Sequence, residues 1–223
     1  MARNTLRATD ASAARPGSAR GLRLEGGTKY ARTRARILDA AAYVLSRQGY
    51  AGTRLSDVAA RASIQTPAIY YYFVSRDELI EEVMASGLAD MREQLTSMLA
   101  ALPPDSPALE RILAAAETHL RHELEISDYT TASIRNQGQV PIRLRQRGQR
   151  EADQYGAVWR ELFDDASSSG QLRADLDPRT AQLLVLGALN WTAEWWDPRR
   201  TSVDAIVATA HNVIRGALQA GHP

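Results

Sequence analysis

Residues Arg61–Arg76 restrict the possible folds more than any other segment of this chain. They read RASIQTPAIYYYFVSR and hold a proline and three consecutive tyrosines between two arginines. Pro67 fits the first position of a helix with Thr66 as its N-cap, and about two turns are expected to follow. A helix that short depends on its neighbours for stability. Because three successive tyrosines cannot all face one core, we expect some hydroxyl groups to point outward toward a polar partner.

A second short helix is expected immediately upstream of this segment. Residues Leu55–Ala62 (LSDVAARA) carry apolar side chains at positions i, i+3, i+4 and i+7, which is the spacing of one helix face. Two short helices joined by a tight turn, the second rich in tyrosine and flanked by arginine, are typical of a helix-turn-helix that reads DNA.

Residues 33–80 resemble the DNA-binding domain of the TetR/AcrR family of bacterial transcriptional regulators. The residues that carry the resemblance follow the family's order: Ile37, Leu38, Ala40, Ala41, Gly49, Tyr50, Thr53, Val58, Ala59, Ile69, Tyr70, Tyr71, Phe73 and Leu79. Three positions depart from the pattern. Arg54 stands where a Ser or Thr usually caps the second helix, Ser63 replaces a turn glycine, and Tyr72 replaces a histidine. We expect Thr53 to cap the second helix instead.

Helix start signals recur along the rest of the chain, and no strand pattern is visible. Ser75 and Glu78 form a capping box, and Ser-Pro, Asp-Pro or Thr-Ser pairs open later segments at residues 106, 177 and 201. The sequence predicts an all-α protein of about nine helices. We expect a disordered basic arm over 1–28, a three-helix helix-turn-helix DNA-binding domain over 29–76, and a larger helical ligand-binding and dimerisation domain over 77–223.

Charge is distributed unequally along the chain, although the net charge is only +1. Residues 1–76 contain 13 of the 27 basic residues and 4 of the 26 acidic residues, so this part carries +9 and the remainder −8. One end of the molecule is therefore suited to a polyanion. Together with the helix-turn-helix, this asymmetry predicts binding to double-stranded DNA.

The residues expected to touch DNA fall into two groups. The candidates for reading base edges are Gln65, Thr66, Pro67 and Ala68. The candidates for binding phosphates are Thr53, Arg54, Tyr70, Tyr71, Tyr72 and Arg76. The Gln65 amide suits adenine, whereas Ile69 and Phe73 are assigned to the core. A dimer would place two such helices in major grooves about 34–36 Å apart, which predicts a palindromic operator.

The last two predicted helices indicate a dimer interface. Residues 179–196 are apolar nearly all round, and residues 203–218 carry one apolar face. A four-helix interface, two helices from each subunit, would cover these surfaces, and the family resemblance implies the same homodimer. The alternative is a helix buried within the monomer.

The resemblance also implies a small-molecule effector that controls DNA binding. Residues 186–198 (LGALNWTAEWWDP) are similar to C-terminal domains of TetR members that regulate fatty-acid or sterol catabolism and bind acyl-CoA thioesters. Trp191 and Trp195 are candidates to line an acyl channel, and Tyr129 and Asn136 are further ligand-binding candidates. The arginines expected to face CoA phosphates are Arg143, Arg145, Arg147 and Arg150. A hydrophobic drug or metabolite is the alternative effector, and the tryptophans could instead serve the core or the dimer contact.

Other functional classes have weaker support in the sequence. His119 and His122 share a helix face beside Glu123, which is compatible with a metal site, although no third ligand is placed. The chain has no cysteine, no G-x-S-x-G sequence and no phosphate-binding loop, which argues against common enzyme classes. A ligand-independent architectural dimer is a further alternative. The longest apolar-rich stretch, 180–193, is too short to span a bilayer, and we expect a cytoplasmic protein that needs no cofactor.

Overall fold

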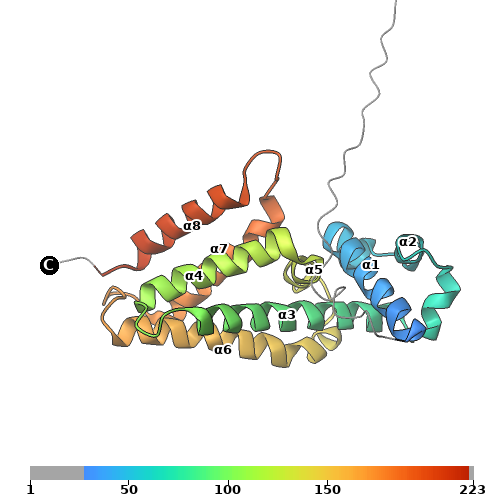
Figure 1. Ribbon diagram of the computed structural model, residues 1–223, viewed down its shortest axis with the longest axis horizontal. Helices are drawn as coiled ribbons and strands as arrows, with labels where there is room; N and C mark the ends of the chain where they lie inside the picture. The colour runs from blue at the N-terminus through green and yellow to red at the C-terminus, as the bar shows by residue number, and fades with distance from the viewer. Residues whose placement is uncertain (1–27, 221–223) are drawn as a thin grey trace, which may run out of the picture.

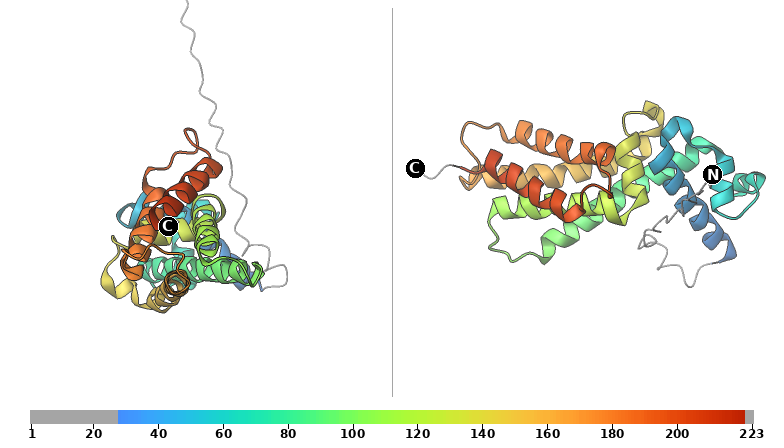
Figure 2. Two further views of the ribbon diagram at one scale, coloured as in Figure 1. Left: turned by 90° about the vertical axis from the view of Figure 1, so that its left-hand side faces the viewer. Right: turned by 90° about the horizontal axis from the view of Figure 1, so that it is seen from above.

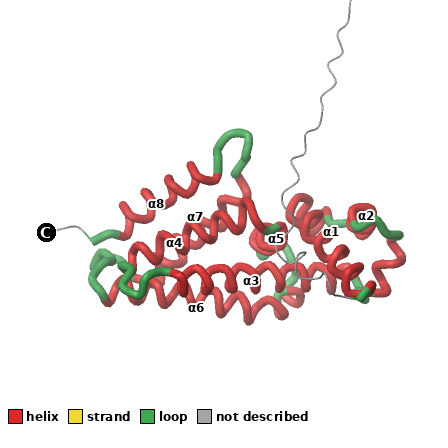
Figure 3. The backbone as a smooth tube through the Cα atoms, viewed as in Figure 1, coloured by secondary structure: helices red, strands yellow, loops and turns green. Residues whose placement is uncertain are grey.

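Residues 28–220 are described in a computed structural model, and their regular structure is helical throughout (Figure 3). The predicted all-α class is confirmed, and these residues contain no strand. The helical segments are α1 (Lys29–Gly52), α2 (Leu55–Arg61), the 3-10 helix η2 (Thr66–Tyr71), α3 (Arg76–Ala101), α4 (Ala108–Arg121), the π-helical turn η3 (His122–Ile126), α5 (Asp128–Asn136), the 3-10 helix η4 (Ile142–Leu144), α6 (Gln146–Ser168), α7 (Pro178–Trp195) and α8 (Val203–Leu218).

The molecule is elongated and has two parts (Figures 1 and 2). We call the part made of α1, α2, η2 and the first half of α3 the head. The remaining helices, with the second half of α3, form the bundle. The basic arm expected over 1–28 lies outside the described residues except for Thr28, whose hydroxyl accepts a bond from the backbone N–H of Ala31 and so caps α1.

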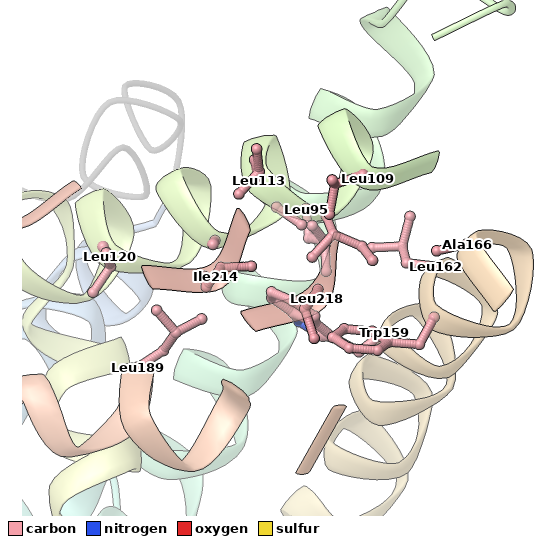
Figure 4. Close-up of a cluster of buried hydrophobic side chains, with 14 of the residues drawn as sticks. Leu95, Leu109, Leu113, Leu120, Trp159, Leu162, Ala166, Leu189, Ile214 and Leu218 are labelled. Carbon is pink, nitrogen blue, oxygen red and sulfur yellow. The ribbon is translucent and has the colours of Figure 1, made fainter. Parts of the chain in front are cut away.

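The two parts have separate hydrophobic cores. The head core gathers Ile37, Leu45, Val58, Ile69 and Phe73 from three helices and their connections. The core of the bundle is built around the fully buried Trp159 of α6, which lies among leucine and isoleucine side chains from the neighbouring helices (Figure 4). Burial of these apolar surfaces is the main force that holds each part together.

Local signals explain where the helices of the head begin and end. Gly49 adopts a φ of 70°, so α1 is interrupted there, as predicted from a glycine in the left-handed region. Ser75 accepts a bond from the Glu78 backbone N–H, and the Glu78 carboxylate accepts one from Val74. Pro67 lies at the start of η2, but Gln65 occupies the N-cap and makes no side-chain cap bond, so the prediction that Thr66 is the cap was wrong.

The helix α3 belongs to both cores. Leu79, Ile80 and Val83 pack in the head, whereas Met91 and Leu95 pack in the bundle. The core of the head therefore extends beyond the boundary that we placed at residue 76 from the sequence. It also takes in Tyr129 and Ala132 of α5, so α5 contributes to the head core as well as to the bundle.

The outer sides of α7 and α8 carry exposed apolar side chains. On α7 these include Leu183, Leu184, Trp191 and Trp195, and on α8 Val213 is exposed. α7 packs on α6 and α8 packs on α4, which leaves the opposite sides of both helices uncovered. Within the described residues, no helix has the length and apolar character needed to cross a membrane.

Candidate nucleic-acid interface

The turn between α2 and η2 is tightly determined by backbone bonds. Ser63 adopts a φ of 54°, the left-handed conformation for which the family pattern has glycine. The Ser63 backbone N–H donates to the carbonyl of Ala60, and that of Ile64 donates to the carbonyl of Ala59. This turn sets the angle at which η2 leaves α2, so the two helices form the predicted helix-turn-helix.

Two buried side chains anchor η2 to the head. Ile69 and Phe73 are almost completely buried, as predicted. The Arg34 guanidinium lies 4.8 Å from the centre of the Phe73 ring and binds both carboxylate oxygens of Glu82 at 2.6 Å. Hydrogen bonding to Glu82 raises the pKa of Arg34. The helix η2, too short to be stable alone, is thus held by packing of Ile69 and Phe73. The bidentate Arg34–Glu82 pair joins α1 to α3 and holds the guanidinium against the Phe73 ring.

The opposite side of η2 is open to solvent. Tyr71 is 82% exposed and Tyr70 58% exposed, and Gln65 and Pro67 are also exposed. Thr66 and Ala68 are half-buried. The prediction that part of the tyrosine run points outward is confirmed. These side chains give η2 hydroxyl, amide and apolar groups on a rigid support, which is the chemistry that base edges and phosphates require.

Tyr72 has a different environment from its two neighbours. It is half-buried, and its ring centre lies 4.8 Å from that of Tyr30 in the first turn of α1. This contact places the start of α1 beside η2. Lys29 and Arg32, both exposed near that start, therefore join the candidate interface. Their three-residue spacing on one helix face was visible in the sequence, but the closeness of that face to η2 was not.

Thr53 and Arg76 require a correction, because both side chains are engaged within the head. Thr53 is buried, and its hydroxyl donates to the carbonyl of Gly49 at 2.7 Å. The Arg76 guanidinium donates to the backbone carbonyl of Thr53 at 2.8 Å and to that of Tyr50. We therefore assign both residues to holding α1, α2 and α3 together instead of to binding phosphate.

Arg54 retains its predicted place at the start of α2. It occupies the N-cap position, its side chain makes no capping bond, and it is exposed. The prediction that Thr53 caps this helix was wrong, because the Thr53 hydroxyl turns back toward α1. A helix N-terminus with a free arginine beside it favours an anion such as a DNA phosphate.

Tyr129 and Asn136, two of the ligand-binding candidates, lie where the bundle meets the head. The Tyr129 hydroxyl donates to Asp39 of α1 at 2.8 Å, and the Asn136 amide donates to the carbonyl of Leu45 at 3.3 Å. Between them on α5, Arg135 donates to the carbonyl of Ser46 at 2.9 Å. These bonds connect α5 to α1, so movement of α5 can reach the DNA-binding surface.

The other residues predicted to bind effector lie on α7 and in the segment that leads into α6. Trp191 is 64% exposed and Trp195 54% exposed on the outer side of α7, so neither lines an interior channel of this chain. In the arginine run, Arg143 pairs with Asp77 at 3.0 Å and Arg147 lies 3.6 Å from Glu82. Arg145 donates to the carbonyl of Val140, which leaves Arg150 as the member without such a contact among the described residues.

The histidine pair singled out as a metal candidate is deeply buried in the bundle. His119 is 1% exposed, His122 7% and Glu123 0%. Nowhere in residues 28–220 do three His, Cys, Asp or Glu side chains form a group that could hold a metal ion. The metal interpretation is therefore not supported within that range.

Two family models match this chain. One, described as bacterial regulatory proteins of the tetR family, matches residues 37–83. The other, described as the tetracyclin repressor-like C-terminal domain, matches residues 105–218, about half of the chain. A helix-turn-helix head joined to a helical bundle is the architecture of a DNA-binding regulator. The chain belongs to the TetR family of bacterial regulatory proteins.

Individual relatives share the whole architecture at low identity. The fatty acid metabolism regulator protein of Bacillus subtilis (strain 168) is 21% identical over 178 residues, covering 80% of this chain and 90% of the relative. The fatty acid degradation regulator FadR from Bacillus halodurans has a TM-score of 0.70 at 19% identity, covering 85% of this chain and 97% of FadR. AibR in complex with isovaleryl coenzyme A and operator DNA has a TM-score of 0.73 at 20% identity, covering 82% and 97% of the two chains. At such identities, the structural likenesses show a shared fold.

Proposed function

We propose that this protein is a ligand-responsive transcriptional repressor that acts in the cytoplasm by binding and not by catalysis. As a homodimer it binds a palindromic DNA operator, and a small hydrophobic or acyl-CoA effector releases it. The observation that carries the DNA-binding part is η2 itself. It is anchored by Ile69 and Phe73 and presents Gln65, Tyr70 and Tyr71 to solvent, within the part of the chain that has a strong excess of basic residues.

The exposed apolar sides of α7 and α8 support the homodimer. An apolar surface of this kind on a folded chain marks an interaction site. A second copy that packs the same two helices against it forms a four-helix interface with twofold symmetry. In such a dimer Trp191 and Trp195 are interface residues, which explains large indole rings on an outer face.

The relatives support the effector class. The Bacillus subtilis relative is a fatty acid metabolism regulator, and AibR has been solved with isovaleryl coenzyme A and operator DNA. An effector can shift the protein only by binding its DNA-free form more tightly than its DNA-bound form. The bonds from α5 to α1 provide a route by which a change in the bundle repositions the head.

Selection of the full-length protein on random duplex DNA tests the proposal. We expect an inverted repeat whose half-sites are about one helical turn apart or a multiple of it. Gln65→Ala should relax base preference at one position of each half-site, at a cost of about 1–3 kcal/mol. Gln154→Ala, an exposed glutamine of α6, is the matched control and should change nothing. Failure to select any inverted repeat contradicts the proposal.

A further inference from the structure

Polar atoms without hydrogen-bond partners are concentrated at one place in the bundle. In the described residues, seven buried side-chain nitrogen or oxygen atoms lack a partner, and six of them belong to four neighbouring residues. They are Nε2 of His119, both ring nitrogens of His122, both carboxyl oxygens of Glu123 and Nε1 of Trp159. The seventh is Oδ1 of Asn136, at the contact between bundle and head.

These side chains come from two parts of the chain that are distant in sequence, α4 with the adjoining η3, and α6. His119 lies in the last turn of α4, His122 and Glu123 lie in the π-helical turn η3, and Trp159 lies in α6. The His119 and Trp159 ring centres are 6.3 Å apart, and Nε2 of His119 lies 3.6 Å from the Glu123 carboxylate. The Tyr155 hydroxyl bonds to Nδ1 of His119 at 2.8 Å. We call these five residues the polar cluster.

Without a hydrogen-bonding partner, the polar cluster lowers the free energy of unfolding. An unpaired buried polar group destabilises a fold by about 1–3 kcal/mol, and an ionised one by more. Apolar side chains of similar size would avoid this cost. The cluster lies among buried leucines such as Leu120 and Leu162 of the same core. A π-helical turn, which often marks a functional site, supplies two of its members.

We propose that the polar cluster recognises an uncharged oxygen, a hydroxyl or a carbonyl, on an otherwise apolar effector. This inference deepens the proposed function and rests on it. The indole N–H of Trp159 can only donate a hydrogen bond, and a neutral imidazole offers one donor and one acceptor. A ligand oxygen accepts from the indole, and a hydroxyl also donates to the Glu123 carboxyl. The surrounding aliphatic side chains suit an apolar body attached to that oxygen.

Charged ligands fit the same atoms less well. An organic cation has no acceptor for the indole N–H, and a carboxylate would bury a negative charge in this apolar core without a cationic partner. Burial raises the pKa of Glu123, with a smaller upward effect of Glu194, while His119 and Arg135 act in the opposite direction. Burial and the neighbouring His119 lower the pKa of His122 to about 4. Both changes favour the uncharged forms of these two groups, which suit an uncharged partner.

The position of the cluster connects it to the DNA-binding head. The turn η3 joins α4 to α5, and α5 binds α1 through Tyr129, Arg135 and Asn136. Thr131 of α5 donates to the backbone carbonyl of Glu123 at 2.6 Å. A ligand that draws the Glu123 carboxyl toward itself therefore acts on η3, the turn that leads into α5 and is hydrogen-bonded to it.

Calorimetric titration of the full-length protein without DNA tests this site. The probes share a ten-carbon chain and differ in the head: 1-decanol, 2-decanone, decanoate and decylammonium. We expect 1-decanol and 2-decanone to bind with Kd values at least about tenfold lower than the two ions. Trp159→Phe should weaken 1-decanol binding about tenfold, because it removes one hydrogen-bond donor. Trp196→Phe is the control, because that indole already donates to the carbonyl of Thr201.

If Trp159→Phe does not fold, variants of Glu123 test the same site. Glu123→Gln preserves a donor and an acceptor and should retain 1-decanol binding, whereas Glu123→Met should lose it and raise the melting temperature. The inference is overturned if no probe binds, if an ion binds most tightly, or if Glu123→Met binds 1-decanol as wild type does. Since no DNA is present, these outcomes are independent of whether the protein binds an operator, which the selection experiment decides separately.

Discussion

Gly87 of α3 lies directly against the backbone carbonyl of Tyr129 in α5. A Cβ atom at position 87 would overlap that carbonyl and the Ser133 hydroxyl. The Thr130 hydroxyl donates to the Gly87 carbonyl at 3.4 Å, and the Ser133 hydroxyl donates to that of Met84 at 2.8 Å. The two helices therefore cross at backbone contact, at the point where the head core ends and the bundle core begins.

Gly87→Ala should accordingly destabilise the protein by about 1–3 kcal/mol, because the added methyl group forces α3 and α5 apart. Denaturant unfolding measures the change. Gly156→Ala is the matched control, since that helical glycine has open space around the built Cβ. There the substitution should stabilise by about 0.5–1 kcal/mol. Equal effects at the two positions would show that the crossing is looser than described.

Arg54 and Arg76 should respond differently to replacement by alanine, although the sequence suggested one role for both. Arg54 is exposed at the start of α2, so Arg54→Ala should weaken binding to all DNA and lower the salt slope by about one. Arg76→Ala removes donors from two backbone carbonyls and should reduce the free energy of unfolding by about 1–3 kcal/mol. Salt-dependent DNA titrations and thermal melts distinguish these effects.

Leu184→Glu should convert the dimer into a monomer without unfolding the chain. Leu184 is 70% exposed on the outer side of α7, so a carboxylate there is solvated in the monomer and buried in the proposed interface. Ile142→Glu provides the comparison, because Ile142 is 76% exposed but lies in η4, away from α7 and α8. Sedimentation velocity should show a loss of dimer for the first variant alone.

His122 should make the protein less stable as the pH falls. The pKa of His122 is about 4 in the folded protein, compared with the usual histidine value of 6.5. Between pH 4 and pH 6.5, the unfolded chain therefore binds a proton at this position and the folded chain does not. The stability of wild type relative to His122→Asn should be constant above pH 7 and fall by about 3 kcal/mol by pH 4. Glu123 titrates in both proteins and should largely cancel from the difference. A pH-independent difference would show that His122 is solvated.

Local signals were sufficient to predict most of the fold. The Ser75 cap, Pro67 and Gly49 marked helix ends that the structure confirms, and Ile69 and Phe73, assigned to the core from the sequence, are buried. Side-chain roles that depend on distant neighbours were not predictable. Nothing in the segment around Arg76 shows that its guanidinium folds back onto α1.

The same limitation applies to the residues expected to bind effector. Periodicity shows that a helix such as α7 has apolar sides, but it does not tell which of them faces inward. The sequence therefore left Trp191 and Trp195 as candidates for an acyl channel, for the core or for the dimer contact. Likewise, the pair His119 and His122 reads as a metal motif until α6 brings Trp159 beside it. A contact between residues 40 positions apart, such as His119 and Trp159, cannot be read from the periodicity of the sequence.

The continuity of α3 has a mechanical consequence. Its 26 residues span about 39 Å without a break, with one end fixed in each core. A stiff rod of that length acts as a lever, and a tilt of about 5° at one end displaces the other by about 3 Å. Rearrangements too small to disturb the packing around Trp159 can therefore move η2 out of register with a DNA groove.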